Sequence, residues 1–319
     1  MKLKIAKFDV TRIAPDATIM VVGKRRTGKS TLIRDIMRHM STKLDFGIAM
    51  CGSEDTAQAM SEYIPPSCIY NEYNAEALDV LLKYQKRCLT MDACKKVYLV
   101  MDDTMYDKTT LKSKNMRLLF MNGRHRKIFF LCAVQYLMDI PPDLRTNVDY
   151  LFVLKENVLA NKEKLHRQFF GMFNEYKDFA MVMNSCTAGF ECMVLDNTAR
   201  SNNPAECVFW YQGDAAGSSF NVGSQGIWKL DKQFGIPENI VGGGQQQQPL
   251  RSKEDMAPML VDDDDEDGRT TVGVAEKMAV EQHRKKSSGA SAGDMALAML
   301  MGQQQAGIHA VEKCGVVRI

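Results

Sequence analysis

Short hydrophobic runs recur along the first 241 residues and alternate with stretches of helical periodicity. Five of these runs are rich in β-branched and aromatic residues, and several are hydrophobic at consecutive positions instead of every second one. The five runs are residues 19–22, 46–50, 97–101, 127–134 and 150–154. Continuous hydrophobic runs are typical of strands that are covered on both faces, as in a parallel sheet.

Hydrophobic residues repeat at helical spacing between these runs, in residues 29–40, 75–89 and 115–121. Strand and helix therefore alternate, which predicts an α/β fold with a mostly parallel central sheet flanked by helices. A chain of 319 residues with 45% hydrophobic content is long enough to bury the core of one large domain of this kind.

The pattern ends at about residue 241, where the sequence changes to GGGQQQQP, an acidic run at 262–267 and a basic cluster at 284–286. This change predicts a boundary between a folded domain, residues 1–241, and a low-complexity tail, residues 242–319, which we expect to be disordered. One Met- and Ala-rich stretch in the tail, residues 290–301, could instead form a helix against a partner.

Overall charge, cysteine content and hydropathy narrow the class of protein further. The formal net charge is only +2, so any surface that binds nucleic acid must be local. The nine cysteines include no C-x-x-C pair and no zinc-finger spacing, which favours reduced thiols. No stretch approaches the roughly 18 consecutive apolar residues of a transmembrane helix, and the N-terminal apolar run is too short for a signal peptide. We therefore expect a soluble intracellular protein without a transmembrane segment.

Residues 23–30 read GKRRTGKS and match the G-x-x-x-x-G-K-S/T phosphate-binding loop (P-loop), between a predicted strand and a predicted helix. The glycines let the backbone wrap around a β-phosphate, and amides at the helix N-terminus donate to its negative charge. Lys29 would bridge the β- and γ-phosphates of ATP, and the Ser30 hydroxyl would bind Mg²⁺. The expected nucleotide-binding residues are Gly23, Lys24, Arg25, Arg26, Thr27, Gly28, Lys29, Ser30 and Thr31. For the three basic residues of the loop, solvated charges without a ligand are an equal alternative.

A second pair of carboxylates follows the hydrophobic run 97–101. Asp102 and Asp103 would lie at the carboxyl end of that strand, which is where ligands bind in open parallel sheets. Asp102 would hold Mg²⁺ through water, as a Walker B aspartate does, and Asp103 could polarise the water that attacks the γ-phosphate. The alternative is a pair of helix caps or loop carboxylates.

Two further candidates surround the run 127–134. Gln135 ends this run and either hydrogen-bonds the γ-phosphate or its water, or simply starts a loop. Arg145 follows in PPDLRTN, and Arg124 and Arg126 precede the run. An arginine that reaches a neighbouring subunit's γ-phosphate can accelerate hydrolysis by about 10³ to 10⁵. Arg145 is the preferred candidate, with a surface charge or local ion pair as the alternative for each arginine.

With these motifs in place, the chain resembles the virion DNA-packaging ATPases of nucleocytoplasmic large DNA viruses, the poxvirus-type branch of the FtsK/HerA superfamily. The resemblance spans residues 15 to about 230, and its most specific part is NGRHRKIFFLCAVQYLMDIPPDLRTNVDYLFVLKE. It implies a RecA-like P-loop NTPase in which the sensor strand lies between the P-loop strand and the strand that ends at Asp102. It also implies a ring, expected to be hexameric, that uses Mg-ATP hydrolysis to move double-stranded DNA into a capsid.

The resemblance also assigns roles and partners. It implies that Gln135 is the sensor and that an arginine near Arg145 acts in trans. Asp103 stands where cellular members of the superfamily usually carry Glu, and a shorter carboxylate can still act as the base through an adjusted water. The expected partners are double-stranded DNA bound without sequence specificity, other copies of the chain, and capsid or membrane-associated virion proteins reached through the tail. We expect the protein in the host cytoplasm at viral assembly sites and in the virion.

Two other functions remain open from the sequence. A P-loop nucleoside or nucleotide kinase would need an acceptor pocket and an arginine-rich lid, whereas a nucleotide-dependent recruitment switch would show slow turnover and no response to DNA. Candidate DNA-contacting segments are the basic residues within 108–114 and within 162–167, for which solvated surface charge is the alternative.

Overall fold

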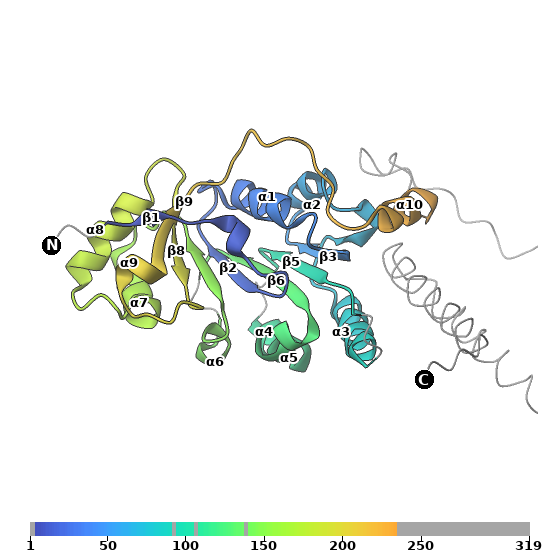
Figure 1. The fold of residues 1–319 in the computed structure, drawn as a ribbon, viewed down its shortest axis with the longest axis horizontal. Coiled ribbons are helices and arrows are strands. Elements are labelled where there is room, and N and C mark those ends of the chain that lie inside the picture. Colours follow the sequence, from blue (N-terminus) through green and yellow to red (C-terminus); the bar gives the residue numbers. More distant parts are fainter. Residues whose placement is uncertain (1–3, 91–93, 105–107, 137–139, 235–319) are drawn as a thin grey trace, which may run out of the picture.

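The computed structural model describes residues 4–90, 94–104, 108–136 and 140–234, and the strands within them form a single sheet (Figure 1). Its nine strands lie in the order β1-β9-β8-β7-β2-β6-β5-β3-β4. They are β1 Ala6–Lys7, β2 Thr18–Val22, β3 Phe46–Cys51, β4 Ile69–Tyr70, β5 Val97–Asp102, β6 Ile128–Val134, β7 Tyr150–Val153, β8 Cys192–Asp196 and β9 Val208–Tyr211. The tail, 242–319, and its candidate helix lie outside the described residues.

The sheet is parallel from β4 to β7, which confirms the predicted fold class. Strand β6 pairs with β2 on one side and with β5 on the other, so the expected sensor strand lies between the P-loop strand and the strand that ends at Asp102. The five predicted strands agree with the structure to within one residue at each end. Strand β8 runs antiparallel to both β7 and β9, and β1 adds to β9 in parallel; none of these three strands was predicted.

The described helices cover both faces of the sheet. Figure 1 shows α1 and α2 on one face, and α3, α4, α5 and α6 on the other. The α-helices are α1 Lys29–Met40, α2 Glu54–Ser61, α3 Ala75–Leu89, α4 Lys108–Lys112, α5 Lys114–Asn122, α6 Pro142–Arg145, α7 Leu159–Phe169, α8 Tyr176–Cys186, α9 Pro204–Cys207 and α10 Gln225–Phe234. Short 3-10 helices span Val10–Arg12, Pro66–Cys68 and Arg124–Arg126. None of the helices in the described ranges is long and apolar enough to cross a bilayer.

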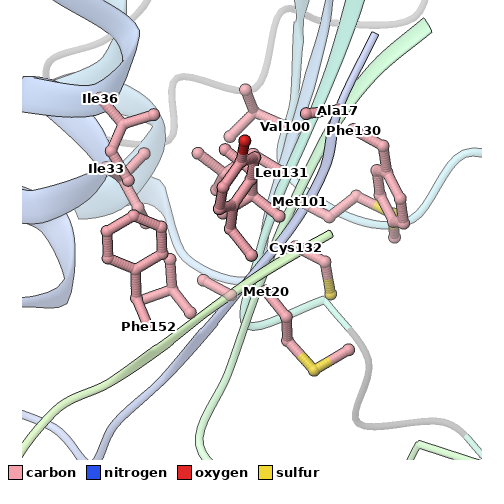
Figure 2. Close-up of a cluster of buried hydrophobic side chains, with 14 of the residues drawn as sticks. Ala17, Met20, Ile33, Ile36, Val100, Met101, Phe130, Leu131, Cys132 and Phe152 are labelled. Carbon is pink, nitrogen blue, oxygen red and sulfur yellow. The ribbon is translucent and has the colours of Figure 1, made fainter. Parts of the chain in front are cut away.

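The helix that follows the P-loop is fixed by hydrophobic packing. Ile33 and Ile36 of α1 are fully buried and lie over one face of the central strands, on the same side as Leu131 and Phe152 (Figure 2). Phe130 lies on the opposite face, because successive side chains of a strand alternate between the two faces. Covering both faces explains the continuous hydrophobic runs of the sequence and holds the first turn of α1 at the carboxyl edge of the sheet.

The chain after β9 crosses over α1 and α2 to reach α10 at the other end of the sheet (Figure 1). We call residues 212–224 the crossing segment. Gly213 approaches the P-loop helix so closely that an added Cβ would lie 3.1 Å from Leu32 Cα. The Phe220 ring stacks on Tyr63, with 5.1 Å between the ring centroids. Asp231 of α10 accepts a hydrogen bond from Ser67 N at 2.8 Å, so α10 is tied to the β4 edge.

Candidate functional site

The P-loop connects β2 to α1, and its two glycines are required by the backbone. A Cβ at Gly23 would lie 2.7 Å from both Leu154 Cδ1 and Thr27 Oγ1, so a larger residue does not fit. Gly28 caps α1 with φ of 98°, a left-handed conformation that favours glycine. Arg26 also has a positive φ, of 62°. The loop therefore turns tightly and presents the amide groups at the start of α1, which is the arrangement that binds a phosphate.

Three predicted catalytic side chains meet at the carboxyl edge of the sheet. Lys29 Nζ lies 2.6 Å from Asp103 Oδ1, and Gln135 Nε2 donates to Asp103 Oδ2 at 3.0 Å. They come from α1, the end of β5 and the end of β6, so the pairing of β5 with β6 sets the Asp103–Gln135 distance. Asp103 has φ of 52°, an uncommon conformation outside glycine that often marks functional sites.

Asp102 is buried beneath this group, with only 3% of the residue exposed. Burial raises the pKa of its carboxyl group to about 6; the positive charge of Lys29 opposes the rise and the negative charge of Asp103 adds to it. Its Oδ1 has no hydrogen-bond partner, although the atom is buried. An unsatisfied buried carboxylate oxygen, together with the exposed Ser30 at the start of α1, is a set of hard oxygen donors that fits Mg²⁺. These two residues would hold the ion.

The remaining residues of the loop differ in their surroundings. Lys24 Nζ forms an ion pair with Glu156 Oε1 at 2.7 Å, whereas Arg25 and Arg26 are exposed. Glu156 also accepts hydrogen bonds from Val158 N and Asn161 Nδ2, which fix its carboxylate beside the loop. Glu156 was not predicted as part of the site. Its signal was available, because it is the first carboxylate after the strand predicted at 150–154.

A pocket of about 340 Å³ adjoins the first turn of α1. Its lining includes Ser30, Thr31 and Arg34 of α1, Thr56 of α2, and Asp214 of the crossing segment. Thr31 is therefore half-buried at the wall of this pocket, next to the loop. The pocket was not predicted, because one wall comes from a segment about 180 residues further along the chain.

The predicted arginine finger lies apart from this group. Arg145 is buried with 9% exposed, and its guanidinium carbon lies 5.9 Å from the centroid of the Phe169 ring. Burial lowers the pKa of its guanidinium group, since the charged form loses solvation. Arg124 forms an ion pair with Asp149 at 2.7 Å, and Arg126 donates to the carbonyl of Leu82 at 2.8 Å. A role of Arg145 in a neighbouring subunit stays a prediction.

The P-loop between β2 and α1, the carboxylates at the end of β5 and the sensor strand between β2 and β5 define a P-loop NTPase. Within this class, residues 6–194 match the model of the poxvirus A32 protein family, and the chain belongs to that family. The resemblance stated from the sequence motifs is therefore confirmed.

Relatives of the chain occur in iridescent viruses. An uncharacterized protein of Invertebrate iridescent virus 3 is 29% identical over 221 residues, which are 66% of this chain and 85% of that protein. One of Invertebrate iridescent virus 6 is 31% identical over 218 residues, 65% of this chain and 83% of that protein. Among solved structures, the chain is similar to the DNA-packaging ATPase of Sulfolobus turreted icosahedral virus. The match covers 63% of this chain and 100% of the ATPase, with 14% identity and a TM-score of 0.46.

Proposed function

We propose that this protein binds and hydrolyses Mg-ATP and uses the energy to move double-stranded DNA into a viral capsid. The observation that carries the enzymatic part is the contact of both Asp103 carboxylate oxygens, one with Lys29 and one with Gln135, beside a P-loop. Membership of the poxvirus A32 protein family supports the packaging role, because the resemblance of the sequence motifs to poxvirus-type DNA-packaging ATPases implies a packaging motor.

Asp103 would act as the general base for the attacking water. In the structure its Oδ1 is held by Lys29 at 2.6 Å. The γ-phosphate of bound ATP would compete for the Lys29 ammonium, because it carries more negative charge than a carboxylate. Asp103 Oδ1 would then be available to accept a proton from water. This exchange would make the base effective only when nucleotide is bound.

Gln135 and the two Mg²⁺ ligands would complete the site. Gln135 donates its amide to Asp103 Oδ2, which leaves its carbonyl oxygen available to orient the attacking water. Ser30 and Asp102 would hold the ion, and Mg²⁺ supplies charge neutralisation on the phosphate oxygens when it is bound. Strand β6 would report a change at Gln135 to the rest of the sheet, since it pairs with β2 on one side and β5 on the other.

DNA would be bound by basic side chains of a ring of subunits. We expect this ring to be a hexamer. Lys112 and Lys114, at the α4–α5 junction, are exposed. Lys162 and Lys164 of α7 instead bond to Asn184 and Tyr136 within the chain, at 2.9 and 2.8 Å. We therefore favour the segment 108–114 as the DNA-contacting one. The tail would bind capsid or membrane-associated virion proteins at assembly sites in the host cytoplasm.

The test is the ATP hydrolysis rate of the full chain with and without long double-stranded DNA, at low and at moderate salt. We expect DNA of any sequence to raise the rate, and salt to reduce this stimulation, because phosphate contacts displace counterions. Indifference to DNA, with turnover only when a nucleoside acceptor is added, would indicate a kinase. ATP binding with slow turnover and no DNA response would indicate a recruitment switch.

A further inference from the structure

Phe190 is exposed in a conformation that its side chain disfavours. Its exposed fraction, 67%, is the highest among the large hydrophobic residues of the described ranges. Its φ is 69°, which is a marked outlier for a bulky side chain. Neither the exposure nor the positive φ contributes to packing of the core. Such backbone outliers cluster at functional sites, which makes Phe190 a candidate for a functional contact.

The fold brings Phe190 to the P-loop. Strand β8 runs antiparallel to β7, with Met193 opposite Val153, so the turn before β8 lies where β7 and its neighbour β2 end. A Cβ added to Gly28 of the P-loop would lie 3.6 Å from Phe190 Cδ1 and 3.8 Å from Phe190 Cβ. The side chain of Phe190 therefore packs against the loop glycine, and most of its surface still faces solvent.

The turn that carries Phe190 is anchored from two sides. Gln212 Nε2 donates to the carbonyl of Gly189 at 3.1 Å, next to Gly213, which packs on the P-loop helix. Thr187 Oγ1 donates to the carbonyl of Met183 at 2.8 Å and ties the turn to the end of α8. The ring is thus fixed relative to the loop by contacts that do not involve the ring itself.

We propose that Phe190 stacks against the base of the nucleotide whose phosphates bind the P-loop, an inference that rests on the proposed ATP-binding function. A nucleotide held by its phosphates at the start of a helix extends its ribose and base outward, and the flat base needs an apolar surface near the loop. An exposed aromatic ring provides that surface through stacking. Stacking does not distinguish bases strongly, so Phe190 contributes to the affinity for ATP and GTP alike.

The test compares binding of ATP with binding of inorganic tripolyphosphate, which has phosphates but no base. Each is titrated with Mg²⁺ into the full chain by isothermal calorimetry, for the wild type and Phe190→Ala. We expect Phe190→Ala to weaken ATP and GTP binding roughly tenfold, within the range measured for base stacking on aromatic side chains. We expect tripolyphosphate binding to stay within about twofold of wild type, since it makes no base contact.

Three further variants separate stacking from effects on the backbone. Phe190→Gly removes the ring and favours the positive φ, so it should show the same selective loss of ATP affinity. Phe190→Tyr keeps the ring and should restore affinity. Met181→Ala removes another side chain that is 62% exposed, on α8, and should bind both ligands like the wild type.

Two results would overturn the proposal. Equal weakening of ATP and tripolyphosphate binding by Phe190→Ala and Phe190→Gly would show that the turn supports the phosphate loop and does not contact the base. Unchanged binding of both ligands would show that Phe190 does not contact the nucleotide. Failure of the proposed function is distinguishable, because the wild type would then bind neither ligand and would match Lys29→Ala.

Discussion

At the scale of single residues, the sequence motifs predicted most of the side chains that form the candidate site. The P-loop pattern identified Lys29 and Ser30, and the end of a hydrophobic run identified Asp102 and Asp103. Their proximity follows from strand order, because parallel strands that end at one edge bring their last residues together. The Lys29–Asp103 ion pair could not be predicted in the same way, because the motifs give neither the positive φ of Asp103 nor the direction of its side chain.

Asp103→Asn tests the general base. The amide is nearly isosteric and its oxygen can still accept from Lys29, but it cannot take a proton from water. We expect ATP binding to remain within a few-fold of wild type and the turnover rate to fall by about 10² to 10⁴. Equilibrium binding and single-turnover hydrolysis measure the two effects separately.

The matched control for this variant is Asp178→Asn, an exposed carboxylate in the first turn of α8. It should leave both quantities unchanged. Wild-type turnover in Asp103→Asn would assign the base to another group, and loss of ATP binding would mean that Asp103 serves mainly to position Lys29.

At the scale of secondary-structure elements, local pattern was sufficient for the buried parallel strands but not for the C-terminal half. Strands β2, β3, β5, β6 and β7 are covered on both faces, so each appears as a continuous hydrophobic run. Strand β8 has a similar composition, CMVLD, but its antiparallel direction is set by pairing with β7 and β9. The crossing segment is largely polar, and its position over α1 depends on isolated contacts such as Phe220 on Tyr63.

Phe220→Ala tests whether these contacts hold the crossing segment on the P-loop helix. Phe220 stacks on the buried Tyr63, and the guanidinium carbon of Arg34 lies 5.5 Å from its ring centroid. Phe220 is half-buried, so we expect its removal to lower the free energy of unfolding by about 2 kcal/mol. In a domain of this size that lowers Tm by roughly 4–8 °C, measured by scanning calorimetry.

Two comparisons sharpen this experiment. Phe220→Tyr keeps both ring contacts and should retain most of the stability. Limited proteolysis should cut residues 212–224 faster in Phe220→Ala than in the wild type, since the segment loses its anchor. An unchanged Tm together with an unchanged cleavage rate would mean that the backbone contacts, such as Val222 N to the carbonyl of Tyr63 at 2.8 Å, are sufficient.

At the scale of the whole molecule, the predicted finger Arg145 does not contact Lys29, Asp103 or Gln135 in the described part of the chain. Arg145 is packed against Phe169 in its own chain. A finger that acts in trans would have to turn outward when subunits assemble, and this would expose the apolar surface that it now covers. Assembly and nucleotide binding would then each favour the outward position, so hydrolysis would depend on neighbouring subunits.

Mixing Arg145→Ala subunits with wild-type subunits tests this dependence. If Arg145 acts in trans within a ring, each mutant subunit would leave its own site intact and disable the site of its neighbour. If ATP hydrolysis proceeds from one subunit to the next, one disabled site also stops hydrolysis in the other subunits. We expect total ATP hydrolysis to fall faster than the mutant fraction rises, and DNA-stimulated hydrolysis to fall most steeply.

A linear decline would show that Arg145 acts only within its own chain, where its packing on Phe169 already gives it a structural role. The control is Arg117→Ala in the same mixtures, because Arg117 forms an exposed ion pair with Asp143 and should have little effect at any ratio. The melting temperatures of the pure variants are measured as well. Arg145→Ala loses a buried contact and should be less stable. Instability of the mutant subunits alone would lower ATP hydrolysis in proportion to their fraction. Only a steeper decline therefore requires action between subunits.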